Sequence, residues 1–329
     1  MKHSIKETES LSRKLFDIVD IARLAPSVHN SQPWRVSMED DRIKVSVDPA
    51  FRLVDGDPTG RQTIISLGIF CEAMLIGLMH YNFQTTKVVF QDESVVLSVK
   101  EVPKPLDVNG DIASLRTRAT DRSIYRPTTI DDKIRKIILA SGAGIPGAKV
   151  WLVRDKPAID HLAKWTAQGI GVALSSASFR HELSHMLVRP HSKKNRGIST
   201  ASLHIPKTLA IVEPMLMGLG LGLKQEVKLE QKRWESASAI CMITTDGDMP
   251  DYWFSAGRVY LRAALAIEKL GLSQATSAST VEASTFHEDV EQLLGTKQRL
   301  QSVIRIGLGA KHRPHSPRVN ANDLISTSN

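Results

Sequence analysis

A run of polar side chains follows a helix-breaking proline in the stretch 25–34, whose sequence is Ala-Pro-Ser-Val-His-Asn-Ser-Gln-Pro-Trp. Ser27, Asn30 and Gln32 offer hydrogen-bond donors and acceptors that suit a polar heterocycle or a phosphate. The same side chains equally suit an Asx or ST turn that satisfies only its own backbone. The chemistry of this stretch alone leaves both interpretations open. We interpret His29 as a surface histidine rather than a proton donor.

A basic cluster with the sequence Arg-Ala-Thr-Asp-Arg stands at 118–122. The guanidinium groups of Arg118 and Arg122 could neutralise a phosphate, with bidentate bonds available to either, and Thr120 could add a hydroxyl donor. On spacing alone, two surface arginines near the start of a helix explain the pattern as well.

Two other motifs carry weaker signals. His181, Glu182 and His185 match the H-E-x-x-H string of zinc-binding helices, but no third ligand is evident, so a zinc hydrolase is the least favoured class. The glycines Gly218, Gly220 and Gly222 have neither the preceding strand nor the following acidic residue of a dinucleotide fingerprint. They are typical of a flexible element.

The elements that must position these residues follow from hydrophobic periodicity and from turn residues. In the first half we expect helices over 9–24 and 61–80, a hairpin of strands 34–36 and 43–47, and strands 87–90 and 95–99. In the second half we expect helices over 131–139, within 158–187 and over 252–270, with strands 150–153, 239–244 and 302–306.

Residues 191–229 lack clear periodicity, and a stretch of this length is usually a lid or another functional segment. From Pro314 onward the chain reads as a tail. The similar order of elements indicates two related halves, 1–108 and 109–319, with a lid-like segment at 190–235 and a tail at 320–329.

Composition narrows the class of protein. The 329 residues include 43 Lys and Arg against 35 Asp and Glu, which gives a formal charge of +8, but aromatic residues are only 5%. With few stacking side chains and scattered basic residues, nucleic-acid binding is not expected, and the charge suits a small anionic ligand. The cysteines Cys71 and Cys241 form neither a disulfide framework nor a metal cage, so we expect a reducing, cytoplasmic location. We expect no membrane-spanning segment, no membrane partner and no secretion signal.

Several motifs together resemble the FMN-binding nitroreductase family. Its APS-x-x-N-x-QPW turn matches 25–34, and its phosphate clamp matches 118–122, followed by Tyr125 and Pro127. Further matches are Ser66-Leu67-Gly68, Ser255-Ala256-Gly257, the closing strand 303–309 and the terminal Arg318. The loop 276–279 corresponds to one beside the flavin ring, which suggests a contact from Ser277, although the residues there depart from the family pattern.

The distribution of the motifs resembles the Acg-like branch, in which two subunits are fused into one chain. The first half has the turn without the clamp, and the second half has the clamp without the turn. In the family's dimers each flavin takes its clamp from one subunit and its turn from the other. The resemblance therefore implies an α+β pseudo-dimer, with central mixed or antiparallel sheets and long interface helices, that acts as a monomer with one FMN between the halves.

The function that the resemblance implies is FMN binding, with NADH or NADPH as the reductant and a nitro or quinone-type acceptor. The implied cofactor-binding residues are Ser27, Asn30, Gln32, Arg118, Thr120, Arg122, Ser277 and Arg318. Arg122 could alternatively lie near the N1–C2 edge of the flavin. The alternative function is a non-catalytic store in which the lid-like segment covers the flavin.

Overall fold

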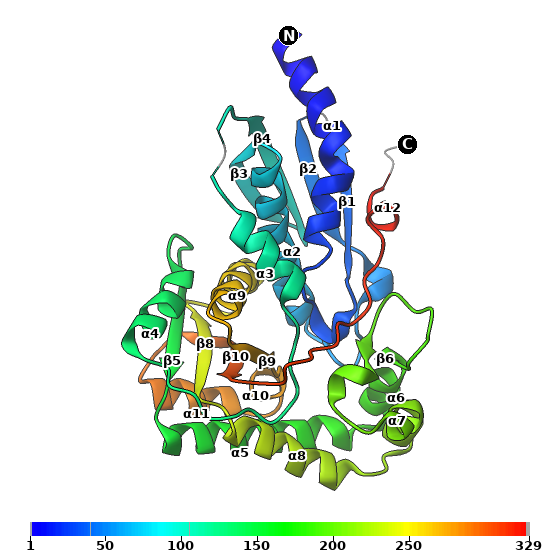
Figure 1. The fold of residues 1–329 in the computed structure, drawn as a ribbon, viewed down its shortest axis with the longest axis vertical. Coiled ribbons are helices and arrows are strands. Elements are labelled where there is room, and N and C mark those ends of the chain that lie inside the picture. Colours follow the sequence, from blue (N-terminus) through cyan, green and yellow to red (C-terminus); the bar gives the residue numbers. More distant parts are fainter. Residues whose placement is uncertain (1, 40, 105, 327–329) are drawn as a thin grey trace.

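The computed structural model describes residues 2–39, 41–104 and 106–326. Two four-stranded antiparallel sheets lie on either side of a central pair of helices, α2 (Arg61–His80) and α9 (Pro250–Lys269) (Figure 1). The prediction of an α+β fold with long interface helices is confirmed, and the sheets are antiparallel rather than mixed.

The first sheet is formed by β1 (Trp34–Glu39), β2 (Arg42–Val47), β3 (Phe83–Gln91) and β4 (Ser94–Glu101), in the order β1-β2-β4-β3. Its inward residues alternate along the strands, as expected for a sheet with one buried face. Helix α1 (Lys2–Ala22) packs against α2, and the carboxylate of Asp57 accepts hydrogen bonds from the first-turn amides of Gln62 and Thr63 in α2. The strands and helices expected in this half are confirmed.

The second sheet repeats this topology. It contains β5 (Ala148–Val153), β8 (Ala239–Thr245), β9 (Ser273–Thr276) and β10 (Arg299–Gly307), in the order β5-β8-β10-β9. In both sheets the first strand is followed by the second, the fourth and then the third. In both halves a 20-residue helix joins the second strand to the third. This shared order supports an internal duplication.

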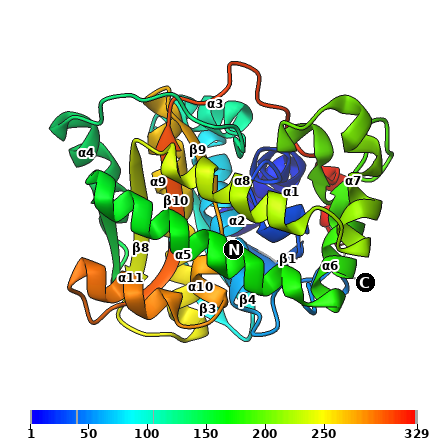
Figure 2. The ribbon, with the colours of Figure 1, turned by 90° about the horizontal axis from the view of Figure 1, so that it is seen from below.

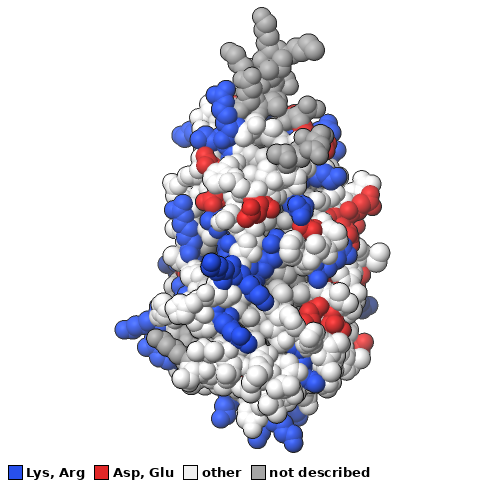
Figure 3. Space-filling model, turned by 90° about the vertical axis from the view of Figure 1, so that its right-hand side faces the viewer, with Lys and Arg blue, Asp and Glu red and all other residues white. Residues whose placement is uncertain are grey.

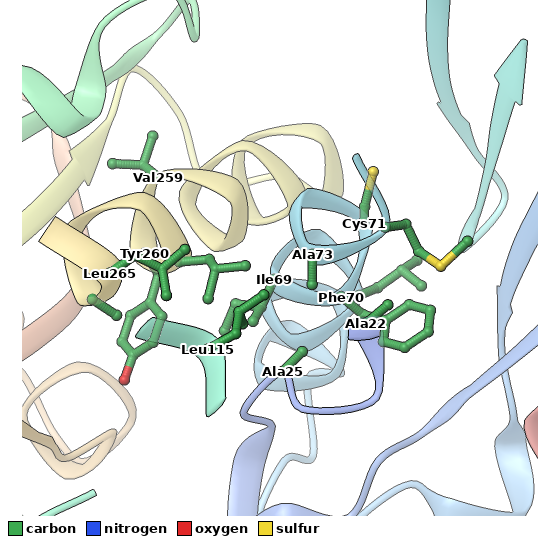
Figure 4. Close-up of a cluster of buried hydrophobic side chains, with 14 of the residues drawn as sticks. Ala22, Ala25, Ile69, Phe70, Cys71, Ala73, Leu115, Val259, Tyr260 and Leu265 are labelled. Atoms are coloured by element: carbon green, nitrogen blue, oxygen red, sulfur yellow. The ribbon is translucent and has the colours of Figure 1, made fainter. Parts of the chain in front are cut away.

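The two central helices touch at a pair of glycines. Gly68 and Gly257 are each the eighth residue of their helix. A Cβ atom at Gly68 would lie 2.2 Å from the carbonyl oxygen of Phe254, and one at Gly257 would lie 2.0 Å from that of Ile65. The backbones therefore meet where a side chain would hold them apart. Figure 4 shows buried apolar side chains of the core to which both helices contribute, including Ile69 of α2 and Val259 of α9.

The halves differ between their first two strands. A short turn joins β1 to β2, whereas the chain between β5 and β8 forms α5 (Lys156–Ser175), α6 (Ala177–Met186), β6 (Leu187–Val188), β7 (Ile198–Ser199), a 3₁₀ turn (Thr200–Leu203), α7 (Lys207–Leu219) and α8 (Leu223–Glu235). Helices α5 and α8 run side by side across the lower surface (Figure 2).

The prediction of an irregular segment over 191–229 is therefore wrong. Helix α7 carries apolar residues around most of its circumference, which hides the helical period. Pro214 lies inside this helix and reads as a breaker in the sequence, while Gly220 and Gly222 adopt positive φ angles where α7 ends and α8 begins.

The remaining helices are short. They are α3 (Asn109–Thr117), α4 (Asp132–Leu139), α10 (Ser279–Glu282), α11 (Phe286–Leu294) and α12 (Ala321–Leu324), with further 3₁₀ turns at Val28–Asn30, Pro49–Phe51 and Ala140–Gly142. Asp131 caps α4 by accepting a hydrogen bond from the amide of Ile134. The hydrophobic pattern did not predict the helices α3, α10, α11 and α12.

The chain after β10 returns to the first half instead of forming a free tail. Val319, Ala321 and Leu324 are buried, and the amide of Ser326 donates a hydrogen bond to the carbonyl oxygen of Val36 in β1. The expected tail 320–329 is thus packed structure as far as residue 326, and residues 327–329 lie outside the described part of the chain.

Helix α2 is long and apolar enough to cross a membrane by composition, but 78% of its apolar window is buried inside the molecule. Its contacts with α1 and α9 identify it as a core helix of this fold.

Candidate functional site

A cavity of about 820 Å³ opens between the two halves. The turn after α1 and the first two turns of α2 form one side, and the 118–122 segment, the 276–279 loop, α7 and α8 form others. Seven of the eight residues singled out in the sequence line this cavity: Ser27, Asn30, Arg118, Thr120, Arg122, Ser277 and Arg318. Segments separated by nearly 300 positions therefore meet at one site.

The turn at 27–32 holds an unusual backbone. His29, Asn30 and Gln32 have φ angles of 45°, 56° and 50°, in the left-handed region that non-glycine residues rarely adopt. The hydroxyl of Ser27 accepts a hydrogen bond from the amide of Gln32 at 2.9 Å. The hydroxyl of Ser66 in α2 accepts one from the amide of Val28 at 3.1 Å. Such concentrated strain persists only where surrounding contacts enforce it, and it clusters at functional sites.

The side chain of Asn30 links three parts of the chain. Its Nδ2 donates to the carbonyl oxygens of Gly197 at 2.9 Å and Pro317 at 2.8 Å. Its Oδ1 accepts a hydrogen bond from Nη1 of Arg318 at 2.8 Å. Asn30 therefore orients Arg318 and joins the turn at 27–32 to the segments before β7 and before α12.

Gln32 lies behind the cavity wall and is fully buried. Its Nε2 donates to the carbonyl oxygen of Asn195 at 2.9 Å, and its Oε1 accepts from the amide of Val319 at 2.9 Å. The structure thus separates Gln32 from the cavity-lining residues and gives it the task of holding two backbone segments against the turn.

Arg118 is buried beside the cavity and forms no ion pair with an acidic side chain among the described residues, because the carboxylate of Glu268, which favours its charge, is paired with Arg313. The side chain of Arg118 is 3% exposed, and its Nε and Nη1 atoms have no hydrogen-bond acceptor among the described residues. Burial lowers the pKa of its guanidinium group, which shows that the positive charge is poorly solvated. A buried cation without a counter-charge is costly, and a bound anion would remove that cost.

Arg318 repeats the pattern from the other end of the chain. Its hydrogen bonds go to Asn30 and to backbone carbonyls, and its Nε has no acceptor among the described residues. Burial, followed by the charges of Arg118 and Arg23, lowers its pKa to about 9. His315 also lines the cavity, and burial together with the neighbouring Arg118 and Arg318 lowers its pKa. These groups form a positive end of the cavity, which we call the arginine end (Arg118, Arg318 and His315).

Arg122 faces different neighbours. Its Nη1 donates to the hydroxyl of Ser202 at 3.3 Å, and the carboxylate of Glu230 in α8 favours its charge. Burial, and then the charge of Arg122, lowers the pKa of His29 to about 4, so this imidazole is neutral near pH 7. The two arginines of the 118–122 cluster therefore serve separate regions of the cavity.

Thr120 and Ser277 also line the cavity. Thr120 forms a parallel bridge with Gln274, next to β9. The hydroxyl of Ser277 lies 2.8 Å from that of Ser279, at the start of α10. Both hydroxyl side chains can offer a hydrogen bond to a ligand.

Two histidines and the cavity-lining residues of α7 and α8 were not predicted from the sequence. His29 lines the cavity, contrary to its interpretation as a surface residue, and His315 joins the arginine end. Residues of α7 and α8, such as Leu209, Glu213 and Leu229, form the wall that faces the central helices. The position of His29 inside the turn was the one available signal.

The H-E-x-x-H string has a structural explanation. The carboxylate of Glu182 accepts hydrogen bonds from the amides of Val54, Asp55 and Gly56. Nδ1 of His185 lies 2.8 Å from the carbonyl oxygen of His181. Within the described part of the chain, no group of three or more His, Cys, Asp or Glu side chains is arranged to hold a metal ion.

The structure thus consists of two related α+β halves that meet through paired helices, with a cavity between them. Curated relatives from two Mycobacterium tuberculosis strains, CDC 1551 / Oshkosh and H37Rv, carry the names "Putative NAD(P)H nitroreductase MT3217" and "Putative NAD(P)H nitroreductase Rv3131". Each is 23% identical to this chain over 325 residues, covering 94% of this chain and 90% of the relative. This similarity along the chain supports the predicted nitroreductase family, while the Acg-like branch stays a prediction. No family model matches the chain.

Solved structures with a related fold include the FMN-dependent nitroreductase NfnB from Mycobacterium smegmatis in complex with NADPH, at 15% identity and a TM-score of 0.44. It matches 67% of this chain and 98% of its own. A nitroreductase with bound FMN from Desulfitobacterium hafniense DCB-2 is 13% identical with a TM-score of 0.41, covering 67% of this chain and 99% of its own.

Proposed function

We propose that this chain binds one FMN between its two halves and acts as an NAD(P)H-dependent oxidoreductase toward nitro or quinone-type acceptors. The observation that carries the proposal is the arginine end, where the buried Arg118 and the half-buried Arg318 lie near each other and neither forms an ion pair with a carboxylate among the described residues. We take residues 1–108 and 109–319 as the two halves that share the site.

The arginine end fits the phosphate of FMN. A phosphate dianion would supply acceptor oxygens for Nε and Nη1 of Arg118 and for Nε of Arg318, which have none among the described residues. His315 could add a further donor from the same segment as Arg318. Asn30 would act by fixing the guanidinium group of Arg318, and Gln32 by holding the backbone on which Val319 stands.

The remainder of the cavity fits the ribityl chain and the ring. Ile65 and Ile69 of α2 supply an apolar surface, and Ser27, Thr120 and Ser277 supply hydroxyl groups. Arg122 would place a positive charge near the ring or its substrate. When bound, FMN supplies the hydride-transfer chemistry, and the chain supplies orientation and electrostatics.

The cavity of about 820 Å³ has the size of a small-molecule site, for which about 300–1,000 Å³ is usual. Turnover needs room for a second small molecule beside the flavin under α7 and α8. A flavin store would need these helices to close against the ring.

We also propose that the chain is a monomer in the cytoplasm. Each half already supplies the partner that a dimeric relative would need. Cys71 and Cys241 are both free and buried, which supports a reducing compartment.

The proposal is tested by titrating apo-protein with FMN and then adding NADPH, NADH and menadione or a nitrofuran in turn. We expect saturation at about one FMN per chain, bleaching of the flavin by a nicotinamide cofactor and steady-state acceptor reduction. Tight flavin binding without bleaching or turnover would favour the storage function. Absence of flavin binding would overturn the proposal.

A further inference from the structure

Helix α7 exposes an apolar face to solvent. Ile211, Met215 and Leu219 are 54%, 52% and 64% exposed, and Val212 beside them is 38% exposed. Leu221, just beyond the end of the helix, is also exposed but lines the cavity. Exposed apolar side chains gathered on one helix face mark a surface that another partner covers. We call Ile211, Val212, Met215 and Leu219 the α7 patch.

The opposite face of α7 is also apolar, because it lines the cavity. Leu209, Leu216 and Met217 point to that side of the helix, together with Glu213. The cavity therefore explains why one face of α7 is apolar, but not why the other face is. The α7 patch needs a separate explanation, since a surface helix of a globular protein normally carries polar residues on its outer face.

The chain beside α7 is basic. No Asp or Glu occurs between Glu182 and Glu213, whereas Arg189, Lys193 and Lys194 are exposed in the loop between β6 and β7. Figure 1 places this loop and α7 on the same side of the molecule, and Figure 3 shows that this side has several Lys and Arg side chains across its middle, with separate groups of Asp and Glu beside them. Exposed apolar residues next to basic side chains are typical of segments that lie at an anionic membrane surface.

We propose that the α7 patch, with the basic β6–β7 loop, docks on an anionic lipid surface. A symmetric dimer through the same patch would bring two copies of the basic loop close together, and their repulsion disfavours a second copy of this chain as the occupant. A lipid surface supplies negative headgroups for the loop and an apolar layer for the patch. Docking there is reversible, because the patch is short and nothing in it spans the bilayer.

This inference revises the expectation of no membrane partner, which rested on the absence of a spanning segment. It does not depend on flavin binding. If the proposed function also holds, α7 would form a wall between the lipid surface and the cavity, and an apolar acceptor such as a quinone would be the suited substrate class.

The test measures co-sedimentation of the full chain with vesicles of phosphatidylcholine containing about one quarter phosphatidylglycerol, and with pure phosphatidylcholine vesicles. We expect binding to the anionic vesicles that weakens with added salt, and little binding to the neutral ones. The variant Ile211→Ser/Met215→Ser/Leu219→Ser should bind at least tenfold more weakly. The variant Lys193→Gln/Lys194→Gln should lose about fivefold for each charge removed.

A matched control replaces three exposed apolar residues elsewhere, Leu106→Ser/Ile124→Ser/Met249→Ser, and should bind vesicles as the unmodified chain does. Circular dichroism and the melting temperature verify that each variant folds. Vesicle binding that is unchanged in both the α7 and the lysine variants would overturn the proposal. So would no vesicle binding at all, or a dimer in analytical ultracentrifugation that the α7 variant dissociates.

Discussion

At the scale of single residues, the buried guanidinium groups explain why this cavity suits an anion. Arg118 is buried and Arg318 is half-buried, and burial followed by the charge of Arg118 lowers the pKa of Arg318. By contrast, Arg313 nearby forms a bidentate ion pair with Glu268 at 2.7 and 2.8 Å. An arginine that serves only packing would be expected to have such a partner. Neither Arg118 nor Arg318 has such a partner among the described residues. We therefore expect both to lower the stability of the apo-protein and a bound anion to restore it.

Replacing Arg118 with Met should separate stability from binding. We expect the apo-protein to gain about 1–3 kcal/mol in free energy of unfolding, because an unpaired buried charge becomes apolar. The affinity for FMN should fall by about 10–100-fold through loss of charge-assisted hydrogen bonds. Urea unfolding and FMN titration measure the two effects.

The exposed Arg116 in α3 provides the control for this substitution. Arg116→Met should change neither the free energy of unfolding by more than about 0.5 kcal/mol nor FMN affinity. A large loss of stability in Arg118→Met would show that Arg118 holds the fold rather than a ligand.

His29 predicts a pH dependence of stability. Its pKa is about 4 in the folded protein and near 6.5 in an unfolded chain, so the unfolded state binds more protons between these values. Its contribution to the free energy of unfolding is therefore full above about pH 6.5 and falls as the pH decreases toward 4. We expect the unmodified protein to lose about 1–2 kcal/mol more between pH 7 and pH 5 than His29→Gln does.

Urea unfolding at both pH values tests this difference. The exposed His161 in α5 offers the matched variant, His161→Gln, which should keep the pH dependence of the unmodified protein. Equal pH dependence in His29→Gln would contradict a buried neutral imidazole at the cavity.

At the scale of elements, the site depends on contacts between segments that are far apart in sequence. The turn at 27–32 receives the chain around Asn195–Gly197 on one side and Pro317–Val319 on the other. The α2–α9 contact sets the distance between the halves, since it joins the element that carries Ser66 to the one that carries Tyr260. Packing of two helices thus fixes the width of the cavity.

Substitution of Gly68 by Ala should weaken this packing strongly. The new Cβ would meet the carbonyl of Phe254, a backbone atom that cannot rotate away, so we expect a loss of about 2–3 kcal/mol in free energy of unfolding. Gly171→Ala, toward the C-terminal end of the equally long α5, is the control, because its Cβ would lie 3.7 Å from Val227 in ordinary contact. That control should gain up to about 1 kcal/mol from helix propensity. Equal stability of the two variants in urea unfolding would refute the close helix contact.

At the scale of the whole molecule, the duplicated halves are symmetric in topology but unequal in their sites. Ile65 lines the cavity, while Phe254 at the corresponding position of α9 is buried and stacks on Phe90 at 4.8 Å. Ile69 also lines the cavity, but its counterpart Arg258 forms an ion pair with Glu72 at 2.8 Å. Because Phe254 and Arg258 are engaged in these contacts, we expect no second flavin on the α9 side.

One FMN per chain is therefore the expected stoichiometry, in contrast to two for a symmetric dimer of separate subunits. Equilibrium dialysis with a protein concentration from amino-acid analysis measures it, alongside the molar mass from light scattering. A ratio near two would show that the filled side opens. A ratio near one half would show that two chains share a site.

Elements whose patterns are local could be predicted from the sequence alone. Alternating strands, the long apolar α2 and the cap at Asp131 depend on neighbouring residues, so they could be read directly. The resemblance to a known set of motifs also predicted seven residues that line one cavity. Helix α7 escaped prediction, since a helix that is apolar on both faces shows no periodic signal.

Which of those residues face the cavity and which support it depends on the three-dimensional packing. Gln32 lies behind the wall and His29 lies within it, because positive φ angles at both residues redirect side chains that are three positions apart. The missing counter-charges of Arg118 and Arg318 were equally invisible in the sequence, where acidic residues stand near both. Ion pairing depends on distances in space, and those are set when the last segment of the chain packs back against the first.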